Sequence, residues 1–129
     1  MSRISDRKRA FEILFARTFY NQGDINDENL SSYSLFLVNG VEKYLDKIDD
    51  IIKKNIKNWK FERISRVTKC ALRIGIFEIL NDDIPIPIVI NEAVELAKIY
   101  GGEEEANYVQ AVMSSVFREF NEQYDEFLF

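Results

Sequence analysis

The sequence predicts an all-α protein, with residues 1–129 forming a single domain of about six or seven helices. Apolar residues recur at three- and four-residue spacing in successive segments, and no segment alternates with period two. The only two prolines, Pro85 and Pro87, interrupt the most apolar stretch of the chain, where a helix cannot continue. With no repeat or long linker and 47% hydrophobic residues, the chain can build one packed core.

The first predicted helix covers residues 6–20, with Ser5 or Asp6 as its N-cap. A polar stretch to about Asn29 follows and indicates a loop. The spacing of the apolar residues gives this helix one inward face, made of Ala10, Phe11, Leu14, Phe15 and Thr18.

Two further helices are predicted before the centre of the chain. The second begins after Asp27 or Ser31 and ends near Tyr44, and the third runs from about Asp46 to Asn58. The core candidates of the second are Tyr33, Phe36, Leu37, Val41 and Tyr44. Those of the third are Leu45, Ile48, Ile51, Ile52, Ile56 and Trp59.

The central segment is predicted as a helix, an extended joint over residues 81–87 and another helix. Phe61 and Ile64 lead into the first of these, which ends near Leu80, and Gly101-Gly102 ends the second. One face of each is apolar: Val67, Ala71, Ile74 and Phe77 before the joint, and Ile90, Ala93, Val94 and Ala97 after it.

The last predicted helix begins at Glu103, where three glutamates suit the positive end of a helix dipole better than they suit a metal. Tail aromatics (Tyr124, Phe127 and Phe129) allow a homodimer without requiring one. The predicted inward residues are Ala106, Val109, Val112, Met113, Val116, Phe117, Phe120 and Tyr124.

The composition excludes most catalytic chemistry. Histidine is absent and Cys70 is the single cysteine, so zinc sites, Ser-His or Cys-His pairs and internal disulfides have no basis. No phosphate-binding glycine motif occurs. We therefore expect no enzyme activity, no cofactor and no metal, and we expect Cys70 to be a small buried hydrophobic residue.

Charge is distributed unevenly along the chain. Residues 41–75 hold ten Lys and Arg against five acids, whereas residues 76–129 hold twelve acids and only Lys98 and Arg118 as bases. Such asymmetry suggests charged partners. No uncharged apolar run is long enough to span a membrane and no signal peptide is evident, which predicts a cytoplasmic protein without membrane association.

Two basic stretches are candidates for RNA contact. Arg7-Lys8-Arg9, followed by Phe11 and Phe15, could bind phosphates and stack on bases, or could simply be a solvated helix start above two core rings. The second stretch, which we interpret mainly as a solvated face, comprises Lys53, Lys54, Lys57, Lys60, Arg63, Arg66, Lys69 and Arg73.

Several segments resemble the NusB family of bacterial transcription antitermination factors. INEAVELAKIYG, residues 90–101, is similar to the family signature almost throughout. Further family segments are resembled at the same places along the chain. They are RKRAFEILF (7–15), CALRIGIFEIL (70–80) with the following DIP (83–85), and YVQAVM (108–113).

The resemblance implies a non-catalytic protein that binds single-stranded boxA-like RNA of ribosomal RNA transcripts. Its partner would be the small-subunit ribosomal protein that serves as NusE, within an RNA polymerase antitermination complex. Carried over by position, the implied RNA contacts are Arg3, Arg7, Phe15, Glu104 and Tyr108, and the implied partner contacts are Thr68 and Lys69.

Some positions depart from the family pattern. Ile4, Ser5 and Asp6 interrupt the basic arm, and Thr68 stands where an acid is usual, which removes a charge-assisted contact to a basic partner. We therefore expect weak RNA binding without the partner. The alternative is a NusB-fold protein–protein adaptor whose RNA binding is weakened or lost.

Overall fold

The computed structural model describes residues 3–19, 30–57, 60–81 and 83–128, with side chains as far as Asn121. All regular elements in these ranges are helical, as predicted. They are α1 (Ile4–Arg17), α2 (Ser32–Lys43), α3 (Leu45–Asn55), the short 3₁₀ helix η2 (Phe61–Arg63), α4 (Arg66–Asn81), α5 (Ile86–Gly101) and α6 (Glu103–Leu128).

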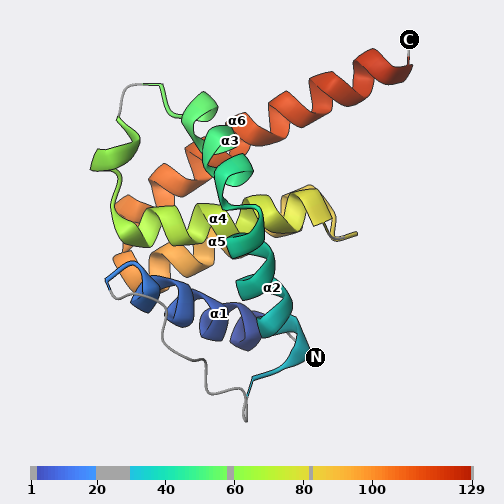
Figure 1. Ribbon diagram of the computed structural model, residues 1–129. Helices are drawn as coiled ribbons and strands as arrows, with labels where there is room; N and C mark the ends of the chain where they lie inside the picture. The colour runs from blue at the N-terminus through green and yellow to red at the C-terminus, as the bar shows by residue number, and fades with distance from the viewer. Residues whose placement is uncertain (1–2, 20–29, 58–59, 82, 129) are drawn as a thin grey trace.

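Helix α4 is the centre of the fold, and each of the other five α-helices packs against it (Figure 1). The prediction of an apolar face on α4 is confirmed, but burial extends around almost the whole helix. A helix that is apolar on most sides is typical of a core position. The buried residues of α4 are Thr68, Cys70, Ala71, Leu72, Ile74, Gly75, Ile76, Phe77 and Glu78.

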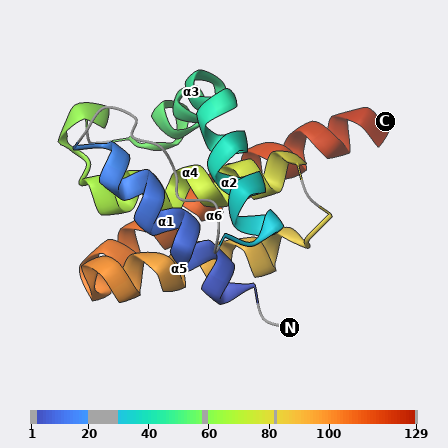
Figure 2. The same ribbon diagram turned by 60° about the horizontal axis from the view of Figure 1, so that its bottom comes forward.

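The end of α1, the start of α4 and the turn between α5 and α6 meet at one end of the molecule, the left side of Figures 1 and 2. From this end α6 runs antiparallel along α5, its main packing partner, and its C-terminal part extends beyond the other helices. None of the helices in the described ranges has the length and apolar character needed to cross a membrane.

Most predicted core residues are buried, including Phe11, Leu37 and Ile52, and Cys70 is 1% exposed. Burial raises the pKa of the Cys70 thiol to about 11, as expected for an inert cysteine in apolar surroundings. Of the remaining core predictions, the side chains of Trp59 and Tyr124 lie outside the described residues.

Two core predictions on α2 are wrong. Phe36 is 41% and Tyr44 39% exposed, because the buried stripe of α2 is rotated toward Leu37 and Val38. Gly40 faces the ring of Phe77, and Phe36 and Tyr44 lie at 5.0 and 6.4 Å from that ring with their outer surfaces in solvent.

The helix boundaries also refine the predictions. Helix α1 begins at Ile4 with Arg3 as its N-cap residue, rather than after Ser5 or Asp6. Ser31 caps α2 as predicted, accepting a hydrogen bond from the Ser34 N–H at 3.0 Å. The proline joint is shorter than 81–87, because Pro87 falls within the first turn of α5, where its missing N–H costs no hydrogen bond.

Candidate nucleic-acid interface

The predicted RNA contact Arg7 lies in the interior. It is 4% exposed, and its guanidinium donates two hydrogen bonds of 2.9 Å to the Glu78 carboxylate, from Nε to Oε1 and from Nη2 to Oε2. Tyr33 donates a further hydrogen bond to Glu78, and Glu92 lies 3.4 Å from Arg7 Nη1. Arg7 thus ties α1 to α4 and presents no guanidinium surface to a phosphate.

The electrostatics agree with this role. Burial by itself lowers the pKa of Arg7, but the hydrogen bonds and negative charge of Glu78, with smaller contributions from Tyr33 and Glu92, raise it above its ordinary value. The charged pair is therefore favoured where it stands. Arg3 and Arg9 of the basic arm remain exposed, and the Arg3 guanidinium lies 4.2 Å from the centre of the Tyr33 ring.

A row of aromatic side chains runs along α1 toward its C-terminal end. The ring of Phe11 stacks on Tyr100 of α5 at 4.3 Å and on Phe15 at 5.9 Å, and Phe15 meets the edge of Phe19 at 5.2 Å. Phe15 is partly buried in this row, whereas Phe19 is 52% exposed. The row therefore ends in an accessible ring of the kind on which unpaired bases stack.

Tyr100 anchors the buried end of the row. Its hydroxyl donates a 2.8 Å hydrogen bond to Glu12, and burial, with this bond and the Glu12 charge, raises the pKa of Tyr100 to about 12. Because Tyr100 is the penultimate residue of α5, this contact joins the end of α5 to α1, and α6 begins shortly after that end, at Glu103.

The exposed end of the row is joined to α4 by a cation. The Arg66 guanidinium lies 4.3 Å from the centre of the Phe19 ring, and Arg66 is the first residue of α4. A guanidinium stacked on an exposed ring can contact a phosphate while the neighbouring ring contacts a base. Neither Phe19 nor Arg66 was among the predicted site residues.

Next to Arg66, a small surface hollow of about 160 Å³ separates the start of α4 from the start of α6. It brings together three predicted residues: Glu104 and Tyr108, which are predicted to contact RNA, and Thr68, which is predicted to contact the protein partner. The hollow is lined by Arg63, Ile64, Ser65, Thr68, Glu104, Glu105 and Tyr108.

Some of the polar side chains that line the hollow are hydrogen-bonded to one another, and one is not. Glu105 accepts from the hydroxyls of Ser65, at 2.7 Å, and Thr68, whose side chain is 1% exposed. Among the described residues, the Tyr108 hydroxyl is buried without a hydrogen-bond partner, and its burial raises the pKa of that group. An unpaired buried hydroxyl is costly unless a ligand or water completes it.

The three glutamates at the start of α6 differ in their availability. Glu103 lies 3.3 Å from the Lys98 ammonium, and Glu105 is engaged by Ser65 and Thr68. Glu104 is exposed on the rim of the hollow, where its carboxylate could accept a hydrogen bond from a base or from a basic partner.

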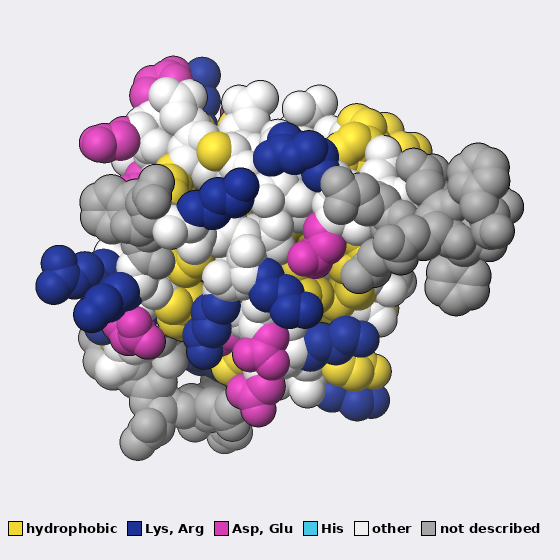
Figure 3. Space-filling view, turned by 90° about the horizontal axis from the view of Figure 1, so that it is seen from above, with side chains coloured by type: hydrophobic (Ala, Val, Ile, Leu, Met, Phe, Trp, Pro, Cys, Tyr) yellow, Lys and Arg dark blue, Asp and Glu magenta, His cyan; other side chains and the backbone are white. Residues whose placement is uncertain are grey.

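Lys69 faces a different side of α4 from Thr68. It lines a cavity between α1, α2 and α4, and its ammonium lies 4.4 Å from the centre of the Phe61 ring. The face seen from above in Figure 3 carries many Lys and Arg side chains interspersed with fewer acidic ones. Of the two predicted partner contacts, Lys69 thus lines this cavity, whereas Thr68 is buried at the hollow beside α6.

The structure therefore gathers Phe15, Thr68, Glu104 and Tyr108 at one end of the bundle, leaves Arg3 at the opposite end of α1, and buries Arg7. The sequence did contain a signal for Phe19, because Phe15 and Phe19 are four residues apart and such pairs are neighbours on a helix. Arg66 was hidden within a basic stretch that resembled a solvated face.

A helical bundle around a buried central helix, with aromatic, basic and hydroxyl groups gathered at one end, defines a small all-α protein with a surface site rather than a deep cleft. Within that class the chain belongs to the NusB family, whose family model matches residues 4–118.

Similar proteins cover nearly the whole chain. The transcription antitermination protein NusB of Clostridium botulinum strain Alaska E43 is 33% identical over 133 residues, covering 92% of this chain and 99% of that protein. Its counterpart from Carboxydothermus hydrogenoformans is 34% identical over 143 residues, covering 98% and 99%. The solved structure of T. maritima NusB has a TM-score of 0.81 at 30% identity and covers 92% of both chains.

Proposed function

We propose that this NusB-family protein is an RNA-binding transcription antitermination factor that acts on ribosomal RNA transcripts. It binds single-stranded boxA-like RNA together with the small-subunit ribosomal protein that serves as NusE. The RNA contacts are Arg3, Phe15 with Phe19, Arg66, Glu104 and Tyr108. Arg7 acts indirectly, by holding α1 against α4.

The observation that carries this proposal is the continuity of the site at the end of the bundle. The exposed Phe19 ring just after α1, the Arg66 guanidinium on it and the hollow lined by Tyr108 follow one another at this end of the bundle. The Tyr108 hydroxyl is buried and has no hydrogen-bond partner among the described residues. This order supplies a stacking ring, a phosphate contact and a hydrogen-bond donor, which single-stranded RNA recognition uses in combination.

The partner supplies what this surface lacks. Glu104 adds negative charge beside the RNA path, and Arg7 is unavailable, so among the proposed RNA contacts only Arg3 and Arg66 are cations that can meet phosphates. A basic ribosomal protein can pair with Glu104 and contribute cations of its own, and buried Thr68 would support that contact through Glu105.

The test is RNA binding by fluorescence anisotropy with a boxA-like RNA, with and without the partner, for the native protein and for Tyr108→Phe. Because the Tyr108 hydroxyl has no partner in the described part of the fold, its removal should leave the thermal midpoint unchanged or slightly higher. If RNA or partner completes this hydroxyl, the variant should bind about tenfold more weakly in the ternary complex.

Phe19→Ala, with Phe36→Ala as a matched exposed aromatic on α2, tests the stacking ring in the same assay. Loss of affinity in the first and not in the second is expected. A native protein that forms no complex with RNA at low salt, alone or with the partner, would overturn the proposal.

The alternative function is a protein–protein adaptor of the same fold without RNA binding, which the burial of Arg7 favours because it removes one cation from the arm. It predicts that the ribosomal protein is captured equally well after ribonuclease treatment and that RNA adds nothing to the complex. A crosslink from RNA to Phe19 or Tyr108 would contradict it.

A further inference from the structure

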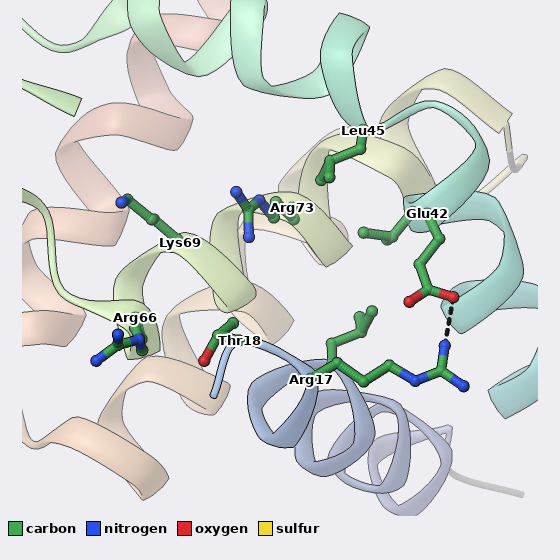
Figure 4. Close-up of a pocket in the computed structure, with 9 residues that line it drawn as sticks. Arg17, Thr18, Glu42, Leu45, Arg66, Lys69 and Arg73 are labelled. Carbon is green, nitrogen blue, oxygen red and sulfur yellow. Dashed lines mark hydrogen bonds and ion pairs between the residues drawn. The ribbon is translucent and has the colours of Figure 1, made fainter. Parts of the chain in front are cut away.

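A second site borders the proposed RNA surface, with which it shares Arg66. It is a cavity of about 360 Å³ between α1, α2, the start of α3 and α4 (Figure 4). Its walls combine apolar side chains with four cations and a single carboxylate. The lining residues are Leu14, Arg17, Thr18, Val41, Glu42, Leu45, Arg66, Lys69 and Arg73.

Two of the four cations are paired. Arg17 forms an ion pair with Glu42 across the cavity, drawn as a dashed line in Figure 4. Arg73 holds Asp49 of α3 through two 2.9 Å bonds, from Nε to Oδ1 and from Nη2 to Oδ2. These contacts join α1 to α2 and α3 to α4, so the structure itself accounts for both arginines.

Arg66 and Lys69 have no such explanation, because no carboxylate pairs with either among the described residues. In Figure 4 their side chains point away from Glu42. The Arg66 guanidinium rests 4.3 Å from the Phe19 ring centre and the Lys69 ammonium 4.4 Å from that of Phe61. Phe61 already has Lys53 at 5.1 Å and Arg73 at 5.9 Å.

Local helix electrostatics make these two positions less favourable still. Arg66 is the first residue of α4 and Lys69 the fourth, and the N-terminal turn of a helix carries partial positive charge. Arg17, in contrast, is in the last turn of α1, where a cation is favoured. An anion in the cavity would offset both the unpaired cations and the start of α4.

The titration of Lys69 agrees with a crowded positive environment. Burial lowers the pKa of Lys69, and the nearby charges of Arg73 and Arg66 lower it further, against the opposing influence of Asp49 and Glu62. A bound anion would oppose this shift, because an opposite charge favours the protonated amine.

We propose that this cavity binds a phosphate-bearing anion, held by Arg66 and Lys69 after their side chains turn from Phe19 and Phe61 into the cavity. Its size is at the lower end of the range of about 300 to 1,000 Å³ typical of small-molecule sites. The phosphate belongs either to a small phosphorylated molecule or to an RNA strand. Either source fulfils the proposal, which does not depend on boxA recognition.

Isothermal titration calorimetry with pyrophosphate, at constant ionic strength in chloride, tests the site. The variants Arg66→Gln and Lys69→Gln should each bind at least about tenfold more weakly, as expected for a lost charge-assisted contact. Lys53→Gln is the matched control, because Lys53 contacts the same Phe61 ring but does not line the cavity. Its affinity should stay within about twofold of the native value.

No pyrophosphate binding by the native protein, or an equal loss in the Lys53→Gln variant, would overturn the proposal. Competition by single-stranded RNA with a 5′-hydroxyl would identify the RNA backbone as the phosphate source, whereas competition by nucleoside monophosphates alone would identify a small molecule. The Tyr108→Phe variant should keep pyrophosphate binding, so failure of the RNA proposal and failure of this one are separable.

Discussion

The guanidinium of Arg7 and the carboxylate of Glu78 are only 5% and 1% exposed, so water contributes little to the solvation of either charge. Each charge is stable in the interior because the other is present, with Tyr33 completing the hydrogen bonds of Glu78. The pair connects residues 71 positions apart in the chain, at the point where α1 crosses α4.

We expect Arg7→Met to lower the free energy of unfolding by about 3–5 kcal/mol, because it leaves the Glu78 carboxylate buried without a cation. Urea denaturation followed by circular dichroism measures this. Arg9→Met is the control, since Arg9 is half exposed and its ion pair with Glu12, at 3.6 Å, lies at the surface. This variant should lower the free energy of unfolding by no more than about 1 kcal/mol.

The double variant Arg7→Met with Glu78→Leu should recover much of the lost stability, because it removes both buried charges together. Equal effects of Arg7→Met and Arg9→Met would show that the pair does not contribute in solution. For the same reason, a loss of RNA binding in an Arg7 variant reports on stability and is no evidence for a phosphate contact.

The positions of the candidate site residues were predictable only in part. The resemblance implies Phe15, Glu104 and Tyr108 as RNA contacts, and the structure brings the segments that carry them to one end of the bundle. The pairing of Phe19 with Arg66 joins positions 47 apart through a cation–π contact, which no local pattern announces. The burial of Arg7 was likewise hidden, because no local pattern pairs it with Glu78, which lies 71 positions away in another helix.

At the level of elements, the close contact between α2 and α4 depends on Gly40. A Cβ built on Gly40 would lie 2.0 Å from Cζ of Phe77, whose ring is 2% exposed and has no room to move outward. This contact sets the rotation of α2, because it fixes which residues face α4. Phe36 and Tyr44 then both lie next to the Phe77 ring.

Gly40→Ala is therefore expected to destabilise the protein by about 1–3 kcal/mol, the usual cost of overpacking, although alanine alone favours a helix over glycine by about 1 kcal/mol. Thermal and urea unfolding provide the measurement. Gly75→Ala should cost less, since its Cβ would meet the flexible end of Met113 at 2.8 Å and Ala93 Cβ at 3.1 Å. A more stable Gly40→Ala variant would contradict the tight contact, and Phe77→Leu should partly rescue it.

The existence and order of the helices were predictable because the 3.6-residue period is strong in each segment and glycine or proline marks several ends. Their rotations were not, because an apolar pattern as broad as that of α2 is compatible with several inward faces. The close approach at Gly40, a tertiary contact, selects one of them. In the same way Pro87 was compatible with a joint or with a first helical turn, and packing of α5 on α4 decided for the helix.

For the whole molecule, the fold turns an uneven distribution of charge along the chain into neighbouring surfaces of different sign. Arg66, at the start of α4, lies beside Phe19 at the end of α1. The hollow between the starts of α4 and α6 is lined by Arg63 on one side and by Glu104 and Glu105 on the other. Under the proposed function, electrostatic attraction of RNA would act next to a carboxylate that disfavours it, so that affinity for RNA would be a balance that the proposed partner shifts.

This balance predicts that RNA affinity depends only modestly on salt, so that the contribution of one exposed cation to the salt dependence can be measured. Each phosphate contact contributes a slope of about −0.7 in log K against log salt for single strands. If Arg3 contacts a phosphate from the exposed start of α1, Arg3→Gln should reduce the magnitude of the slope by about 0.7, and Arg3→Lys, which keeps the charge, should not. Lys47→Gln, on the outer face of α3, is the control and should leave the slope unchanged.

Anisotropy titrations of the ternary complex at several salt concentrations provide these slopes. Equal slopes for Arg3→Gln and the native protein would remove Arg3 from the RNA path and restrict the phosphate contacts to the end of the bundle around Arg66.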